Sequence, residues 1–101
     1  MMNFSSEYLN ECIEICKAIN PDKIENMAEL INSVRKDKGR IFFLGVGGGA
    51  GHAGHAVNDF RKICSIESYA PTDNVSELTA RVNDDGMGYI LCQLVKRVTF
   101  K

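Results

Sequence analysis

The chain has 101 residues, of which 45% are hydrophobic and 25% charged, and its formal net charge at pH 7 is -1. This length allows one domain at most, and the near-neutral charge excludes the strongly basic surface that attracts nucleic acid or anionic membranes. The N-terminus lacks a signal-peptide pattern, and no run is long and apolar enough to span a bilayer. We therefore expect a cytoplasmic protein whose partners include neither nucleic acid nor a membrane.

Two amphipathic helices are expected at the start of the chain, within residues 5–38. Between residues 9 and 19, apolar side chains recur three and four positions apart, which is the spacing of one helix face. Asn20 and Pro21 then suit the N-cap and the first position of a second helix.

A strand, a glycine-rich turn and a third helix are expected next, in that order. Residues 40–44 are short, continuous and apolar, which is typical of a strand buried on both faces of a parallel sheet. Glycines dominate residues 45–54, and helical spacing resumes from Ala53 to Cys64. The pattern therefore predicts a buried strand that leads directly into a helix.

The remaining segments are less regular. Residues 65–70 are expected to form a second strand, Asn74 or Ser76 to cap a short helix, and residues 83–86 to form a turn. The last fifteen residues, 87–101, fit a strand or a helix about equally well. The pattern leaves their structure open.

The glycine turn, residues 45–51, is the first candidate for a binding site. Glycines let the backbone turn sharply and approach a ligand closely. Amides at the start of a helix then favour a phosphate, with help from the helix dipole. The alternative is a turn in which the glycines serve only tight packing between strand and helix.

Two nucleotide-binding patterns can be compared with this turn. No Gly-Lys-Ser or Gly-Lys-Thr ends it, which excludes a nucleoside-triphosphate P-loop. Gly45-x-Gly47-x-x-Ala50, with Glu67 downstream, fits a variant dinucleotide fingerprint. That fold usually begins with the fingerprint strand, whereas two helices precede the strand here. We expect no nucleotide cofactor and keep a dinucleotide-binding module as an alternative.

A polar face is expected on the third helix, because His52, His55 and Asp59 follow the turn at offsets of three and four. Imidazoles and a carboxylate one turn apart can share a divalent metal, and zinc is the usual choice for such ligands. The same groups are suited to moving protons between neighbouring carbons of a sugar. The alternative is a solvated helix face without chemistry.

Two segments resemble a known family. The segment GRIFFLGVGGGAGHAGHAVNDFRK resembles the first strand, loop and helix of the sugar isomerase (SIS) family, and PTDNVSELTARVNDDG is similar to the next shared segment. The closest branch looks like the phosphoheptose isomerases, which convert sedoheptulose 7-phosphate to a heptose phosphate. The resemblance runs from about Ser5 to Gly86 and implies an α/β fold, a three-layer α/β/α domain with a parallel sheet, preceded by two N-terminal helices.

The resemblance also implies roles for individual residues. It makes His55 and Asp59 metal ligands and places both in catalysis, with Asp59 as the base that shifts a proton through an enediol. It implies a substrate site made of the glycine turn and four polar loop residues, namely Gly45, Gly47, Gly48, Gly49, Asp73, Asn74, Asn83 and Asp84. The metal would be zinc, and the ligand a phosphorylated sugar.

Three departures from the family pattern shape the expected function. Gly49 stands where the family usually has serine, and Asp59 is shorter than the usual glutamate. After Gly86 the likeness ends, so residues 1–101 read as one partial domain, with helices over 5–38, a core over 40–86 and a divergent tail over 87–101. We expect sugar-phosphate binding, isomerase activity in the parent fold but not in this chain alone, and self-association through the N-terminal helices. The alternative is a sugar-phosphate-binding or regulatory module without catalysis.

Overall fold

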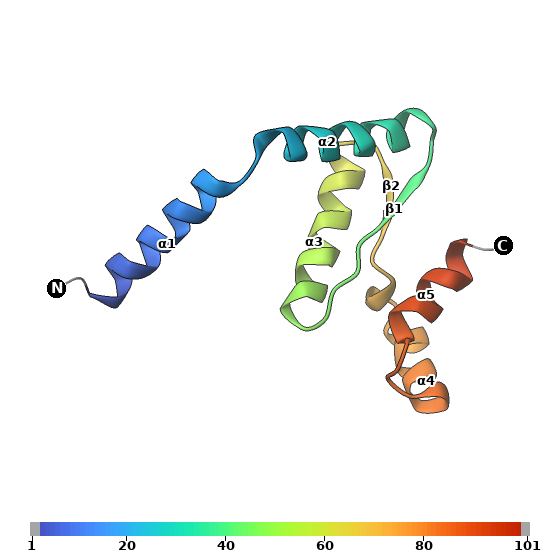
Figure 1. The fold of residues 1–101 in the computed structure, drawn as a ribbon. Helices are drawn as coiled ribbons and strands as arrows, with labels where there is room; N and C mark the ends of the chain where they lie inside the picture. Colours follow the sequence, from blue (N-terminus) through green and yellow to red (C-terminus); the bar gives the residue numbers. More distant parts are fainter. Residues whose placement is uncertain (1–2, 100–101) are drawn as a thin grey trace. The chain divides into compact units, whose positions relative to one another are not determined.

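A computed structural model of the chain describes residues 3–99 and divides it into two compact units, residues 1–32 and 33–101 (Figure 1). The boundary between the units falls within the second helix. The elements in chain order are α1 (Phe4–Ala18), α2 (Pro21–Lys36), β1 (Arg40–Phe42), α3 (Gly48–Lys62), β2 (Glu67–Tyr69), the 3-10 helix η1 (Pro71–Asp73), α4 (Val75–Asp85) and α5 (Ile90–Thr99).

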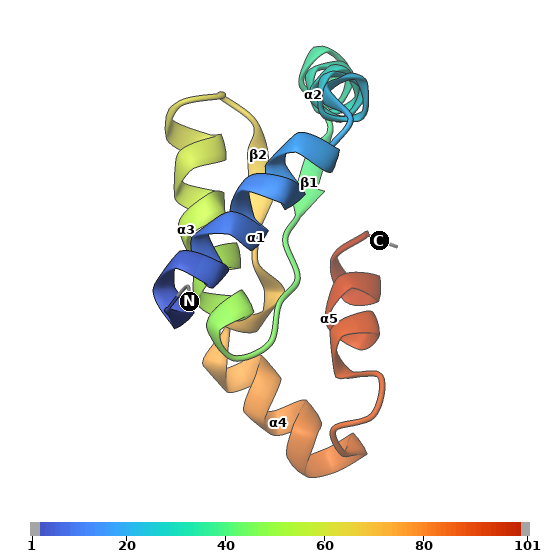
Figure 2. The same cartoon turned by 60° about the vertical axis from the view of Figure 1, so that its left-hand side comes forward.

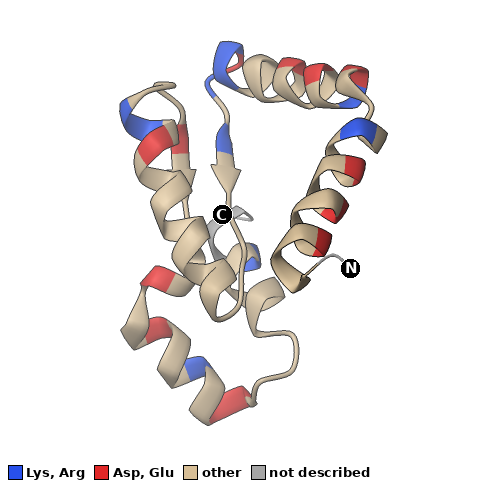
Figure 3. Cartoon of the chain, turned by 90° about the vertical axis from the view of Figure 1, so that its left-hand side faces the viewer, with Lys and Arg blue, Asp and Glu red and all other residues tan. Residues whose placement is uncertain are grey.

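Each helix of the first unit begins at a capping asparagine, and the cap at Asn20 is the one that the sequence predicts. The Asn3 side chain accepts a hydrogen bond from the amide of Ser6 at 2.9 Å, and Asn20 accepts one from the amide of Asp22 at 2.9 Å. Neither α1 nor α2 contains a buried residue, although both carry apolar stripes. Figure 3 shows the acidic positions spaced along α1, and Lys17 lies in the last turn of this helix. The helices are thus defined locally and not by burial.

The second unit is built around one β–α–β element, which confirms the predicted order of strand, glycine turn, helix and strand. Strands β1 and β2 are parallel, with Ile41 opposite Ser68, and α3 packs against β2. Figures 1 and 2 show α3 running back beside the strands, in the direction opposite to theirs. The buried cluster between them consists of Ala53, Val57 and Ala70, with Phe43 packed against it.

Helices α4 and α5 form the second part of this unit (Figure 2). Helix α5 packs against α4 and η1 and buries Leu94, which is 1% exposed, and Ile90. The segment that the sequence left open between strand and helix is therefore helical over Ile90–Thr99. The predicted turn at residues 83–86 is shorter than expected, because α4 continues to Asp85 and only Gly86, at φ 82°, leaves the helix.

The predicted three-layer α/β/α domain is wrong. Residues 3–99 hold five α-helices and a sheet of two strands with three residues each. The prediction took β1 for a strand covered on both faces, but Arg40 is exposed and Leu44, just after β1, is 48% exposed. The second reason lies after Gly86, where the chain adds the helix α5 instead of further strands to the sheet.

Over the described residues, every helix is too short or too polar to cross a membrane.

Candidate functional site

The glycine turn connects the end of β1 to the start of α3 and depends on glycine at two positions. A Cβ atom on Gly45 would lie 2.2 Å from the backbone carbon and oxygen of Gly49, so no other residue fits without moving the backbone. Gly47 adopts φ 58° and ψ -123°, a conformation that side chains strongly disfavour. The turn is therefore a fixed loop, in which Gly45 allows close packing and Gly47 the reversal of the chain.

Some amides of this turn are already hydrogen-bonded. The amide of Gly49 donates to the carbonyl of Val46 at 3.0 Å, and that of Ala50 donates to the carbonyl of Gly47 at 3.0 Å. Within residues 3–99, no hydrogen bond uses the amides of Gly47 and Gly48, and both residues are exposed. Two amides at the positive end of α3 are thus free to bind an anion, fewer than the sequence pattern suggests.

No charged side chain belongs to the turn or to the first part of α3. The sequence holds no Lys, Arg, Asp or Glu between Arg40 and Asp59, and Figure 3 shows this stretch in the neutral colour. An anion at the turn would therefore be bound by backbone dipoles without help from a cation of the same segment. Such a site is expected to bind weakly.

His55 and Asp59 form the pair that the helical spacing predicts. The Nδ1 atom of His55 lies 3.1 Å from Oδ2 of Asp59, and their side chains are 77% and 43% exposed. Asn58 donates to the other carboxylate oxygen of Asp59 at 3.4 Å. His52 is exposed on the same helix, and within the described residues no interaction joins it to the pair. The acid–base pair exists, but water reaches both of its members.

His55 and Asp59 together offer two ligands to a metal ion. Zinc in proteins is held by three or four side chains, and the described part of the chain brings no three His, Cys, Asp or Glu side chains together for a metal. The pair His55 and Asp59 is therefore an incomplete donor set for zinc. The predicted zinc role of these residues stays a prediction.

The glycine turn and the acid–base pair lie far apart along α3. Asp59 follows Gly48 by eleven residues of one continuous helix, which the helical rise converts to about 16 Å along the axis. That separation exceeds the length of an extended seven-carbon sugar chain. A phosphate bound at the Gly48 amide would hold its sugar out of reach of the Asp59 carboxylate.

Asp73 is the predicted loop residue that the structure brings to α3. A Cβ atom on Gly54 would lie 3.2 Å from Oδ2 of Asp73, so the carboxylate approaches the bare backbone in the first half of α3. Asn74, the next predicted residue, accepts a hydrogen bond from the amide of Glu77 at 3.1 Å and caps α4. Its side-chain oxygen is thus engaged in a structural role.

Asn83 and Asp84 lie at the other end of α4. Asn83 follows Asn74 by nine residues along one helix, or about 14 Å by the helical rise. Both are exposed, and Asn83 donates a hydrogen bond to Oδ1 of Asp84 at 3.2 Å. Figure 2 shows this end of α4 pointing away from α3. The structure therefore does not bring the pair to the glycine turn.

Two residues near the site were missed at the level of sequence. Gly54 makes room for Asp73, and an isolated glycine inside a helical pattern could have indicated such a contact. Arg61 donates from Nε to the carbonyl oxygen of Ser68 at 2.7 Å and stacks over the Tyr69 ring at 5.2 Å. Nothing in the local pattern distinguishes Arg61 from an ordinary solvated arginine at a helix end.

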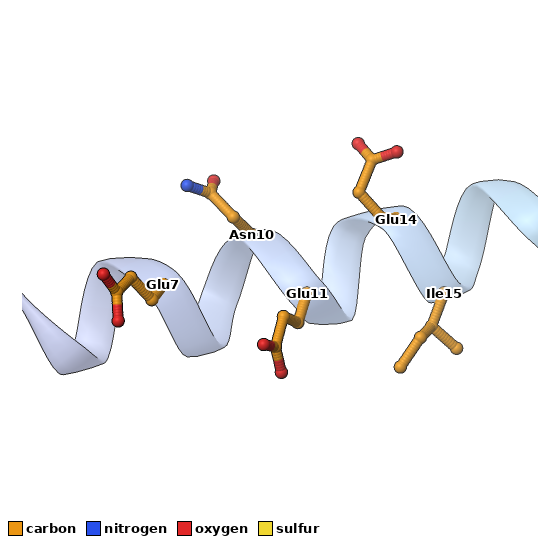
Figure 4. Close-up of a pocket in the computed structure, with 5 residues that line it drawn as sticks. All are labelled: Glu7, Asn10, Glu11, Glu14 and Ile15. Carbon is orange, nitrogen blue, oxygen red and sulfur yellow. The ribbon is translucent and has the colours of Figure 1, made fainter. Parts of the chain in front are cut away.

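A shallow cavity with a volume of about 560 Å³ also lies in the first unit, along α1. Its lining residues, Glu7, Asn10, Glu11, Glu14 and Ile15, all belong to that one helix. In Figure 4, Asn10 and Glu14 point to one side of the helix, and Glu11 and Ile15 to the other. Because one helix alone lines this cavity, it cannot enclose a ligand, and we do not assign it a function.

Comparison with protein-family models, with curated proteins and with solved structures finds no match for this chain.

Proposed function

We propose that this chain binds a phosphorylated sugar at the start of α3, as the resemblance to the SIS family implies. The observation that carries the proposal is the pair of exposed amides at Gly47 and Gly48, which have no partner among the described residues. Amides at a helix N-terminus favour a phosphate group. The rigid turn at Gly45 supports this, because preorganised amides lose little entropy on binding.

Binding without turnover is the form of this proposal that the geometry favours. The candidate base Asp59 is about 16 Å along the helix from the Gly48 amide, and its side chain is 43% exposed to water. Proton abstraction needs the base within hydrogen-bond reach of the reacting carbon. Asp73, which approaches α3 at Gly54, is closer to the turn in the chain's fold and is suited to accept hydrogen bonds from sugar hydroxyls.

The proposal also includes the location of the protein in the cell and its self-association. We expect a cytoplasmic protein that self-associates through α1 and α2, whose apolar stripes include residues that are more than half exposed, such as Leu9 and Met27. Amphipathic helices of this length are marginal in water without a partner. A partner for these helices is therefore required for their stability.

The test uses one substitution that removes an amide and one that keeps it. Gly48 is the first residue of α3, where proline is favoured, so Gly48→Pro should remove the N–H while preserving the helix. A Cβ atom at Gly48 meets nothing within 4 Å, so Gly48→Ala is the matched control. We expect Gly48→Pro to weaken binding of sedoheptulose 7-phosphate about tenfold or more and Gly48→Ala to leave it nearly unchanged, measured by calorimetry.

The unphosphorylated sugar provides the second arm of this test. Sedoheptulose should bind more weakly than its 7-phosphate to the unmodified chain and should not respond to Gly48→Pro. Equal affinities for the two ligands, or equal effects of the two Gly48 variants, would contradict the phosphate site.

A second candidate function, aldose–ketose isomerisation, is supported by the 3.1 Å contact between His55 and Asp59. It requires the sugar to bind beside Asp59 and not with its phosphate at the Gly48 amide. In that case NMR of the sugar phosphate in D₂O should show exchange of the carbon-bound proton, and Asp59→Asn should abolish it. Ligand binding without proton exchange would leave the binding function and remove the catalytic one.

A further inference from the structure

The two outer edges of the β1–β2 sheet differ in a way that indicates how the sheet can extend. Backbone N–H and C=O groups point alternately to the two sides of a strand. The amide of Phe43 donates to the carbonyl of Tyr69 at 2.8 Å, so Ile41 and Phe43 face β2. The N–H and C=O groups of Arg40 and Phe42 therefore point away from β2, toward the outer edge of β1.

The outer edge of β2 is closed by α3. Ser68 is the residue of β2 whose carbonyl points outward, and this oxygen accepts the 2.7 Å hydrogen bond from Nε of Arg61. Ser68 itself is fully buried, and its hydroxyl donates to the carbonyl of Ile66 at 3.0 Å. No further chain can add to this edge without displacing the arginine.

The outer edge of β1 is open. The sheet within residues 3–99 has two strands only, so no strand pairs with β1 on this side. A groove of about 580 Å³ lies beside Leu44, two residues after the end of β1, and its other lining residues belong to α5 and include Leu91 and Val95. Figure 1 shows α5 on the side of the strands opposite α3. An apolar edge of this kind pairs with another strand when one is available.

We propose that the outer edge of β1 pairs with the same edge of a second copy of this chain, antiparallel and about a two-fold axis at Phe42. A sheet of two short strands is marginal by itself, and the pairing would create a four-stranded sheet in the order β2-β1-β1-β2. The outward groups at Phe42 would exchange two hydrogen bonds with Phe42 of the other copy. This inference is independent of the proposed sugar-phosphate site.

The charge on the edge selects the antiparallel arrangement. Arg40 is the one charged residue between positions 40 and 44. Pairing about Phe42 sets Arg40 of one copy opposite Leu44 of the other, so the two arginines lie at opposite ends of the new ladder. A parallel, in-register pairing would instead place them side by side. The Phe42 rings, each stacked on its own Tyr69 at 5.7 Å, would become cross-strand neighbours.

Hydrogen exchange of single amides tests this pairing apart from any association through α1 and α2. The Phe43 amide is bonded within each copy and serves as the internal control. On raising the concentration into the range where ultracentrifugation shows dimers, the Phe42 amide should exchange about tenfold more slowly, while Phe43 changes little. A chain that stays monomeric, or a dimer in which Phe42 exchanges as fast as in the monomer, would overturn the proposal.

Charge substitutions at Leu44 test the register. Leu44 is 48% exposed, so its replacement leaves the core intact. Leu44→Glu should tighten the dimer about fivefold by facing Arg40 of the other copy, and Leu44→Lys should weaken it by a similar factor. Ile63→Glu and Ile63→Lys, at a position 75% exposed after α3, control for net charge. Equal dimer affinities for the two Leu44 variants would overturn pairing about Phe42.

Discussion

Residues 3–32 and residues 33–96 carry helical patterns of similar clarity, yet only the second region buries any side chain. In α1 and α2 the apolar stripe lies open, with Leu9 61% and Leu30 69% exposed. In the second region, Val57 of α3 and Leu94 of α5 are buried against strands or neighbouring helices. An amphipathic period therefore specifies a helix, while burial depends on whether another element supplies the opposing face.

Two glycine substitutions test whether the second region has one defined packing. Gly45→Ala would place a methyl group 2.2 Å from the Gly49 backbone, and we expect a loss of about 3 kcal/mol or more in the free energy of unfolding. In Gly51→Ala the new methyl meets nothing within 4 Å inside α3, and stability should rise by up to about 1 kcal/mol. Urea unfolding measures both. Equal midpoints would mean that the turn is not fixed.

A pair of truncations compares the two regions directly. Leu94→Ala removes a side chain that is 1% exposed and should cost about 3 kcal/mol, as buried leucines do. Ile15→Ala in α1 removes one that is 62% exposed, and in dilute solution it should change unfolding by less than about 0.5 kcal/mol. A comparable cost at Ile15 would show that α1 is packed and would remove the contrast between the regions.

The smallest effect concerns the pH dependence of the sheet. The hydrogen bond from the Tyr69 hydroxyl to Glu67, 2.6 Å long, raises the pKa of Tyr69 above 10.0, with desolvation adding to it and Arg61 opposing it. A raised pKa means that the folded state holds the Tyr69 proton more tightly than the unfolded chain does. The stabilisation of the folded state by this hydrogen bond is therefore present below pH 10 and is lost as the pH rises through the pKa of the folded state.

Absorbance of the tyrosinate measures that titration. Glu67→Gln removes the charge that opposes ionisation, so the pKa of Tyr69 should move back toward 10.0. An unchanged titration in Glu67→Gln would mean that the contact does not persist in solution.

The local features of this fold were predictable from the sequence, but the number of strands in its sheet was not. The order of strand, glycine turn and helix was readable because each segment is bounded by glycine and changes its period at the boundary. The contact between His55 and Asp59 was predictable because it needs only one helix. The number of strands was not, since the interpretation left residues 87–101 open between strand and helix, although Ile90, Leu91, Leu94 and Val95 recur at the spacing of one helix face.

The predicted site residues show the same difference between local and long-range features. Gly45 and Gly47 have the special geometry that glycine implies, because backbone conformation is a local property. Asn83 was expected near the glycine turn, but its position depends on how far α4 extends, which no local pattern sets. Asp73 does approach α3, through a contact with Gly54 that joins two distant segments.

The bond from Arg61 to Ser68 has a consequence for the order of folding. It joins residues seven positions apart, and the amide of Ile66 adds a bond to the carbonyl of Phe60 at 3.0 Å. The ladder between β1 and β2, by contrast, joins Ile41 to Ser68, which are 68 - 41 = 27 positions apart. Closing the shorter loop costs about 1 kcal/mol less chain entropy. Helix α3 and β2 therefore have the lower entropic cost of docking, and we expect β1 to add to them afterwards.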